Sequence, residues 1–258
     1  MRRFDGVEYA VIPGFRPLEL DLYLPDTVSA PGAVEVPVIV HVHGGGWRRG
    51  SRRHPLPRLG EDFYPAMVRE GFAVAAIDYR LSGEATYPAA ADDVRAAVAA
   101  VAEVMAAHGV GAGKVFLWGD SAGAHLALLA ALTGSAVAGV VAWFPVTDLT
   151  AMPDPVDPGT REALFLGAPA AEIPDLAREA SPISHVRADA PPVLVMHGDS
   201  DTMVPTAQSV DFAAALTAAG GSAQLVLVPG ASHFWDGAAD VTALHRRSLA
   251  FLRTLVTP

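Results

Sequence analysis

The most distinctive chemical group in the sequence is a serine set between glycines, in Gly119-Asp-Ser-Ala-Gly123. The residues before it, Lys114 to Trp118, predict a strand, and the alanines and leucines after it predict a helix. A sharp turn from strand to helix strains the backbone of the serine. It also exposes the hydroxyl at the helix N-terminus, where the dipole favours negative charge. Ser121 is therefore predicted to be a nucleophile, and a chance Gly-Ser-Gly turn is the alternative.

A run of three glycines follows an earlier predicted strand, in His43-Gly-Gly-Gly-Trp47. Glycines let a backbone approach a substrate closely and turn its N–H groups inward. In hydrolases with an exposed serine, such a loop supplies hydrogen bonds to the oxyanion. We expect the amides of Gly45, Gly46 and Ala122 to form this oxyanion hole. A phosphate-binding loop is the alternative, but the glycine spacing and the Lys-Ser/Thr ending that it needs are absent.

Two residues beside these motifs are predicted to line a substrate pocket. Trp47 ends the glycine loop and could form a wall, although a large aromatic side chain beside a turn could equally be packed in the core. Asp120 directly precedes the serine. Further aromatic side chains could widen the pocket into a slot: Phe144, Phe165, Phe234 and Trp235.

An acid and a base follow the serine in the chain order expected of such hydrolases. Two aspartates stand just past the apolar run that starts at Val193, and His233 follows the next predicted strand. Asp201 is preferred to Asp199 as the orienting acid, because Asp199 lies in the turn itself and could cap the backbone. His233 is predicted to be the general base. The other histidines are expected to be structural: His41, His43, His54, His108, His125, His185, His197 and His245.

Arginines cluster directly after the glycine loop, at Arg48, Arg49, Arg52 and Arg53. Such a cluster could attract substrates that carry a carboxylate or a phosphate. The preferred interpretation is a solvated basic loop, because clustered surface charge is common.

The composition excludes several classes of protein. Hydrophobic residues make up 51% of the 258 residues and charged residues 18%, which indicates a compact globular chain rather than a disordered one. The net charge of -10 argues against nucleic acids and anionic membranes as partners. There is no cysteine, so disulfides, thiolate metal sites and a cysteine nucleophile are absent, and no metal or other cofactor is expected.

The location of the protein is predicted from its apolar segments. The first residues include Asp5 and Glu8 and lack the apolar run of a signal peptide, and no window is apolar enough for a spanning helix. These features predict a cytoplasmic protein.

The scaffold that must position these groups follows from alternating short and long apolar segments. Strands that are apolar on both faces predict a parallel sheet covered by helices on both sides. Six such strands are expected at 36–42, 72–78, 114–119, 138–144, 192–198 and 222–228, with an antiparallel edge at 7–12 and 18–24. Helices are expected at 61–70, from about 87, after 119, and at 206–219 and 240–256.

One segment interrupts this alternation. Six prolines, at positions 153, 155, 158, 169, 174 and 182, separate short helical pieces such as Arg161–Leu166. We expect residues 148–190 to form a small cap over the carboxyl edge of the sheet, where sites lie in such folds. The prediction is one α/β-hydrolase domain over residues 1–258, with a mostly parallel, twisted sheet of about eight strands.

Together these motifs resemble esterases of the hormone-sensitive-lipase type and, more closely, the bacterial bifunctional deacetylase and feruloyl esterase group. The matching runs are His43-Gly-Gly-Gly-Trp47, Asp78-Tyr-Arg-Leu-Ser82, Gly119-Asp-Ser-Ala-Gly-Ala-His125, Phe144-Pro-Val-Thr-Asp148, Ser181-Pro-Ile-Ser184 and His197-Gly-Asp-Ser-Asp201. The resemblance implies hydrolysis of acetyl and other small esters, with carbohydrate acetates and hydroxycinnamate esters among the substrates. Kynurenine formamidases are similar in the same motifs, which leaves amide hydrolysis as an alternative.

The expected function is therefore that of a serine carboxylesterase acting on small-molecule esters with acetyl to butyryl acyl groups. A feruloyl esterase or an amide hydrolase is the alternative within the enzymes. A ligand-binding protein that kept the fold is the alternative from another class, because a fold alone does not prove activity. The sequence carries no signal of oligomeric state.

Overall fold

An eight-stranded sheet forms the centre of the computed structural model, which describes residues 1–26, 35–53 and 59–256. The strand order is β1-β2-β4-β3-β5-β6-β7-β8. The strands are β1 (Arg2–Ala10), β2 (Leu18–Leu24), β3 (Glu35–Val42), β4 (Ala73–Ile77), β5 (Gly111–Asp120), β6 (Gly139–Trp143), β7 (Val193–Gly198) and β8 (Ala223–Val228). From β4 to β8 neighbouring strands are parallel, while β1 and β2 form an antiparallel edge. This is the expected α/β-hydrolase sheet.

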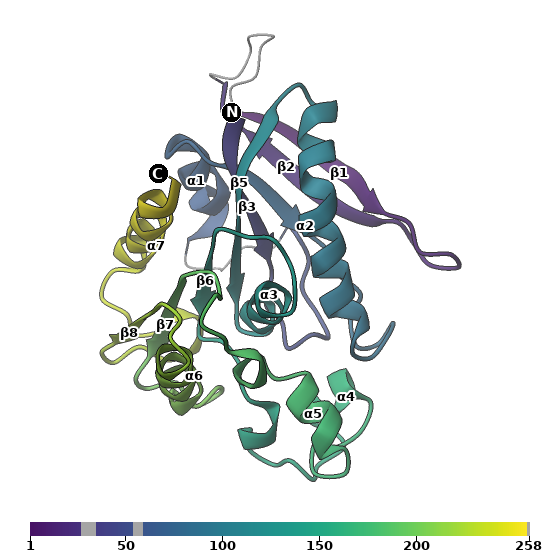
Figure 1. Ribbon diagram of the computed structural model, residues 1–258, viewed down its shortest axis with the longest axis vertical. Helices are drawn as coiled ribbons and strands as arrows, with labels where there is room; N and C mark the ends of the chain where they lie inside the picture. Colours follow the sequence, from purple (N-terminus) through teal and green to yellow (C-terminus); the bar gives the residue numbers. More distant parts are fainter. Residues whose placement is uncertain (27–34, 54–58, 257–258) are drawn as a thin grey trace.

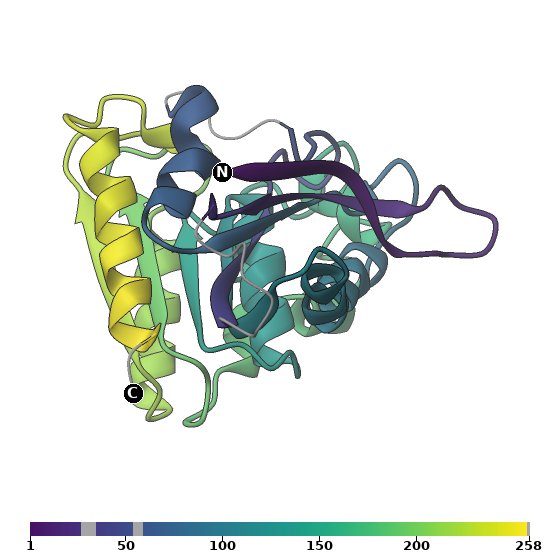
Figure 2. The same cartoon turned by 90° about the horizontal axis from the view of Figure 1, so that it is seen from above.

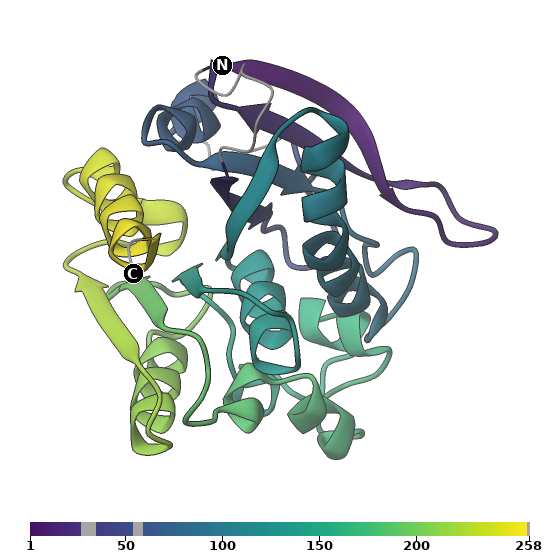
Figure 3. The same cartoon turned by 45° about the horizontal axis from the view of Figure 1, so that its top comes forward.

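Helices cover both faces of the sheet (Figures 1 and 2). On one face lie α2 (Ala89–Ala107), α3 (Ala122–Leu132) and α6 (Ala207–Ala218), and on the other lie α1 (Phe63–Arg69) and α7 (Val241–Val256). In Figure 3 strands β7 and β8 separate α6 from α7. Because strand side chains alternate between faces, Val40 joins the first core while its neighbour Ile39 joins the second. Burial on both faces explains why these strands read as continuous apolar runs.

Helix α3 is the most deeply buried helix, with all of its residues inside the protein. It lacks a polar face because it lies between the sheet, α2 and the 3-10 turn Pro182–His185. A side-chain carbon at Gly123 would lie well inside 3.0 Å of the backbone of Val42 and His43. Glycine therefore lets α3 start against the end of β3, which brings the serine turn and the glycine loop together.

The predicted cap segment leaves the sheet after β6 and returns at β7. It contains the short helices α4 (Arg161–Leu166) and α5 (Pro174–Glu179), which lie beside α3 at one end of the molecule (Figure 1). Thr160 accepts a hydrogen bond from the amide of Ala163 and so caps the start of α4. Gly167 ends the helix in the left-handed conformation.

Strands and helices differ from their predicted bounds mainly at the ends. Strand β5 begins at Gly111 rather than Lys114, because Glu35 and Val36 of β3 extend the pairing to Gly111 and Ala112. Strand β1 begins at Arg2 rather than Val7, in a stretch whose polar side chains hide the pattern. Within the described residues, no helix is long and apolar enough to cross a membrane.

Candidate active site

The turn at Ser121, the predicted nucleophile, has the strained geometry that its motif predicts. Ser121 has a φ of 53° and a ψ of -120°, between the end of β5 and the first residue of α3. A side-chain carbon at Gly119 would lie well inside 3.0 Å of the backbone of Gly123 and Ala124. Both glycines of the motif are therefore required by close backbone approaches, and the serine is held at the carboxyl edge of the sheet.

Three predicted residues meet at this edge. The Nε2 atom of His233 lies 3.0 Å from the Oγ of Ser121, and its Nδ1 lies 2.6 Å from Oδ2 of Asp201. Because the carboxylate can only accept, Nδ1 carries the ring proton and Nε2 is left to accept from the serine hydroxyl. Ser121 and Asp201 are 112 and 32 residues from His233 in the sequence. They lie together in space because β5, β7 and β8 are parallel and end at one edge of the sheet.

Asp201 is held by several donors at once. Its Oδ1 accepts from the amides of Met203 and Val204, at 2.8 and 3.0 Å, and its Oδ2 faces both His197 and His233. Burial alone would raise the pKa of this carboxyl group, but the hydrogen bonds from His197 and His233 hold the pKa well below its usual range. The group is a fixed anion at neutral pH.

His197 contacts the predicted acid, Asp201, although the sequence predicted only a structural role for this histidine. Its Nε2 lies 3.2 Å from Oδ2 of Asp201 and 3.1 Å from the carbonyl oxygen of Val204, and its Nδ1 lies 2.6 Å from the hydroxyl of Ser209. Two acceptors at Nε2 require the proton there, so the hydroxyl donates to Nδ1. The available signal was the four-residue spacing from Asp201 at the end of a strand.

Asp199 has a different role from Asp201. It is exposed and accepts hydrogen bonds from the amide of Gly230, at 2.8 Å, and from the hydroxyl of Ser200, at 3.0 Å. It thus ties the loop after β7 to the loop after β8. The carboxylate that contacts His233 is that of Asp201.

The glycine loop lies next to Ser121. The amide of Gly44 donates to Asp120 at 3.1 Å, whereas Gly45 and Gly46, with φ of 123° and 62°, line a cavity of about 180 Å³ together with the serine. Ala122 begins α3, so its amide is among those that have no intrahelical acceptor. The three predicted donors are therefore near the serine.

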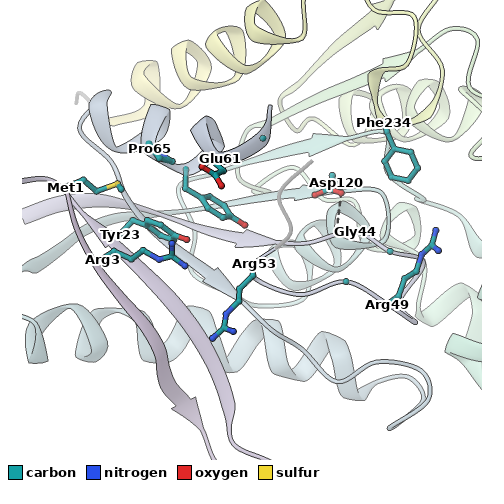
Figure 4. A pocket seen from close by; sticks show the side chains of 14 residues that line it. Met1, Arg3, Tyr23, Gly44, Arg49, Arg53, Glu61, Pro65, Asp120 and Phe234 are labelled. Carbon is teal, nitrogen blue, oxygen red and sulfur yellow. Dashed lines mark hydrogen bonds between the residues drawn. The ribbon is translucent and has the colours of Figure 1, made fainter. Parts of the chain in front are cut away.

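Asp120 lines a larger neighbouring cavity of about 900 Å³, where it faces the glycine loop (Figure 4). Burial raises the pKa of this carboxyl group to about 7, and only the Gly44 amide and its own backbone amide oppose that rise. Its Oδ1 lies 3.6 Å from Nε2 of His41, but burial lowers the pKa of His41 to about 3, so this histidine is neutral. Arg49 and Phe234 lie at the same end of this cavity (Figure 4).

Trp47 lines neither of these two cavities, and of the two alternatives given for it the structure shows packing in the core. Its side chain is 1% exposed, stacks on Phe165 at 4.8 Å and donates from Nε1 to His125 at 3.1 Å. His125 in turn donates to the carbonyl oxygen of Ala180 at 2.7 Å. Trp47 therefore joins the glycine loop to α3 and to the segment 148–190.

Of the four aromatic side chains expected to widen the pocket into a slot, only Phe234 lines either of these two cavities. Phe144, Phe165 and Trp235 are buried, because they pack in the two cores. Phe234, with a φ of 60°, lines both cavities.

The arginine cluster separates into two groups. Arg52 is buried and forms ion pairs with Glu19, Asp21 and Asp78, so it anchors the loop to β2 and to the end of β4. Arg48, Arg49 and Arg53 are exposed. The preferred interpretation, a wholly solvated basic loop, is wrong for Arg52. His54, from the set of histidines, lies outside the described residues.

Within the described ranges, no group of three or more histidine, cysteine or acidic side chains is placed to hold a metal ion.

The fold and this arrangement of serine, histidine and aspartate are those of the α/β hydrolases. The chain belongs to the BD-FAE family, whose sequence profile matches residues 20–216. The resemblance to the deacetylase and feruloyl esterase group is thereby confirmed.

Curated relatives are similar over most of the chain. Esterase LipQ of Mycobacterium tuberculosis is 37% identical over 248 residues, which cover 89% of this chain and 57% of that protein. The isoprenylcysteine alpha-carbonyl methylesterase ICME of Arabidopsis thaliana is 27% identical over 249 residues, which cover 88% of this chain and 56% of that protein. The chain thus spans somewhat more than half the length of these relatives.

Solved structures share the whole fold. A truncated carbohydrate esterase from gut microbiota superposes with a TM-score of 0.87 and 28% identity, covering 100% of this chain and 97% of that one. The apo form of Thermogutta terrifontis esterase 2 gives a TM-score of 0.77 with 25% identity, covering 97% and 95%.

Proposed function

We propose that this chain is a serine carboxylesterase that hydrolyses small esters with acetyl to butyryl acyl groups. The observation that carries the proposal is the position of His233, whose two ring nitrogens contact Ser121 and Asp201 at 3.0 and 2.6 Å. The names of LipQ, ICME and the gut carbohydrate esterase support ester hydrolysis as the reaction.

In the proposed mechanism, Ser121 attacks the ester carbonyl while Nε2 of His233 takes the hydroxyl proton. The histidine then gives this proton to the leaving alcohol, and an acyl-enzyme remains on the serine. Water, deprotonated by the same histidine, hydrolyses the acyl-enzyme. Asp201 stays ionised throughout, keeps the proton on Nδ1 of the neutral ring and stabilises the imidazolium when it forms.

The oxyanion of each tetrahedral intermediate would accept hydrogen bonds from the amides of Gly45, Gly46 and Ala122. The Gly44 amide already donates to Asp120, which leaves the next two amides of the loop for this role. Loss of one such donor typically raises the barrier by about 3 to 4 kcal/mol.

The proposal includes a short acyl group because the cavity at Ser121 is small. Its volume of about 180 Å³ lies below the roughly 300 to 1,000 Å³ of pockets for drug-sized ligands. Arg161 of α4 and Met203 are among the residues that bound it. We propose that residues 148–190 act as a small cap within one domain and contribute this closure.

Labelling and turnover test the proposal together. A fluorophosphonate probe should attach to the wild-type chain at Ser121, and p-nitrophenyl acetate should be hydrolysed. Ser121→Ala and His233→Ala should each remove nearly all turnover, and the double variant should be no slower, because triad residues act as a unit. Circular dichroism controls for folding. A folded Ser121→Ala protein with near-native rates would refute the assignment.

A further inference from the structure

The cavity at Ser121 is unusually basic for an acidic chain. Arg48, Arg49 and Arg161 line it together with Gly45, Gly46, Met203 and Phe234, and no carboxylate is among these lining residues. The chain as a whole has a net charge of -10. Three arginines that line one small cavity therefore contrast with the overall negative charge of the protein.

These arginines come from two separate segments that converge on the glycine loop. Arg161 is the first residue of α4, and its aliphatic stem lies directly against Gly46, where a side-chain carbon would come well inside 3.0 Å. The backbone and Cγ of Arg49 lie against Gly45 in the same way. Arginines from the glycine loop and from the segment 148–190 thus meet at the proposed oxyanion site.

The three guanidinium groups have no ion-pair partner in the part of the chain that the structure describes. Arg52, four residues beyond Arg48, shows the contrast, because it is surrounded by Glu19, Asp21 and Asp78. Glu162 adjoins Arg161 in the sequence but is buried and does not line the cavity. Asp120 faces the neighbouring cavity instead. The positive charges of these three arginines are therefore not paired with a carboxylate among the described residues.

We propose that this site selects esters that carry a carboxylate in addition to the scissile ester bond. The inference rests on the proposed esterase function and names its substrate class. Guanidinium groups bind carboxylates through paired hydrogen bonds, and their fork geometry suits a planar anion better than an ammonium group does. The small volume of the cavity places such a carboxylate within a few bonds of the ester carbonyl.

The test compares esters of nearly equal size that differ in charge. One pair has the charge in the alcohol part, 4-acetoxybenzoate against 4-acetoxybenzamide. The other has it in the acyl part, monoethyl glutarate against ethyl 4-carbamoylbutanoate. For the wild-type chain, the ratio of kcat/KM for the anionic ester to that for the neutral ester should favour the anion in at least one pair. It should fall as salt is added. No preference in either pair would overturn the proposal.

Variants assign that preference to the arginines. Arg48→Gln, Arg49→Gln and Arg161→Gln should each lower the ratio by about three- to tenfold, mainly through KM of the anionic ester. Arg161→Lys should keep part of the preference. Arg247→Gln on α7 is the matched control, because Arg247 is exposed and does not line this cavity, and it should leave the ratio unchanged. Ratios that stay at the wild-type value in all three Gln variants would overturn the proposal.

Calorimetry separates this inference from the proposed function. The products 4-hydroxybenzoate and 4-hydroxybenzamide can be titrated into the wild-type and Arg161→Gln proteins whether or not either ester is hydrolysed. Tighter binding of the carboxylate by the wild type, weakened in the variant, supports the basic site even if the chain hydrolyses neither ester. Equal binding of both products, together with no preference for the anion in the acyl-side pair of esters, would overturn it even if the chain is an active esterase.

Discussion

Two neighbouring aspartates at the end of β7 differ because of their contacts. Asp201 accepts from two backbone amides and faces two histidines, whereas Asp199 accepts from the amide of Gly230 and the hydroxyl of Ser200. A buried carboxylate with this many donors stays ionised and fixed, which an orienting acid requires. The exposed carboxylate of Asp199 instead fixes the loop after β8 through the amide of Gly230.

This difference predicts unequal effects of the same substitution. Asp201→Asn should lower kcat for p-nitrophenyl acetate by about three to four orders of magnitude, because an amide no longer enforces the productive ring tautomer of His233. Asp199→Asn should cost less than about tenfold, since it only loosens the loop after β8. Rates of both purified variants at one pH decide the matter. The reverse ranking would assign the acid to Asp199.

Asp120 should make stability depend on pH. Its pKa of about 7 in the folded chain exceeds the roughly 3.9 of an unfolded aspartate, so the folded state holds a proton that the unfolded chain has released between these values. Stability from this group is therefore lost as pH rises from about 4 to 7. The free energy of unfolding of Asp120→Asn, taken relative to that of the wild type, should therefore rise by a few kcal/mol from pH 5 to pH 8.

Urea unfolding at the two pH values measures that gain. Asp175→Asn is the control, because Asp175 lies at an exposed position of α5. The difference in free energy of unfolding between this variant and the wild type should be nearly the same at pH 5 and pH 8. If the Asp120→Asn difference is the same at pH 5 and pH 8, the carboxyl group is not perturbed as described.

The candidate catalytic residues could be predicted from the sequence, because they follow strands in a known order along the chain. The residues whose position depends only on tertiary packing could not. The positions of Ser121, Asp201 and His233 follow strands, and parallel strands bring such positions to one edge. The choice between pocket wall and core packing for Trp47 could not be made from the sequence, because nothing local reveals that His125 and Phe165 hold it in the core. Arg161 lies far from Arg48 in the sequence, and only the return of the segment 148–190 brings them together.

At the scale of elements, the contact between α3 and β3 positions both the serine and the glycine loop. Gly123 permits it, because any side chain there would overlap the backbone at Val42 and His43. The apolar runs predicted the centre of each element well. The ends of an element depend on pairing partners in other parts of the chain, such as Glu35 for the start of β5. The local sequence pattern holds no information about these partners.

Gly123→Ala should therefore lower the free energy of unfolding by about 3 kcal/mol or more, because rigid backbone rather than a movable side chain occupies the space. Activity should fall with it, since Ser121, the proposed nucleophile, directly precedes α3. Gly83→Ala is the matched control, at an exposed glycine with open space around it, and should change stability by less than about 0.5 kcal/mol. Chemical denaturation compares the two. Equal effects would show that α3 tolerates displacement from β3.

At the scale of the whole molecule, the candidate site combines contributions from distant parts of the chain. The glycine loop after β3, the turn after β5, the segment 148–190 and the loops after β7 and β8 all reach the small cavity. Trp47, His125 and Ala180 form a continuous buried connection among the first three of these parts. The lining of the cavity is thus set by the segments that the sheet brings together rather than by any one motif.

The acyl-chain preference should reflect this shared closure. Each buried methylene contributes only about 0.8 kcal/mol, and a chain too long for a cavity of about 180 Å³ gains nothing from the methylenes that stay outside it. Along a series of p-nitrophenyl esters from two to sixteen carbons, kcat/KM should peak between acetyl and butyryl and fall for longer chains. Methyl ferulate, measured beside them, tests whether a planar ring can use the larger cavity next to Phe234. A maximum at ten carbons or longer would mean that the segment 148–190 opens a channel and that the enzyme acts as a lipase.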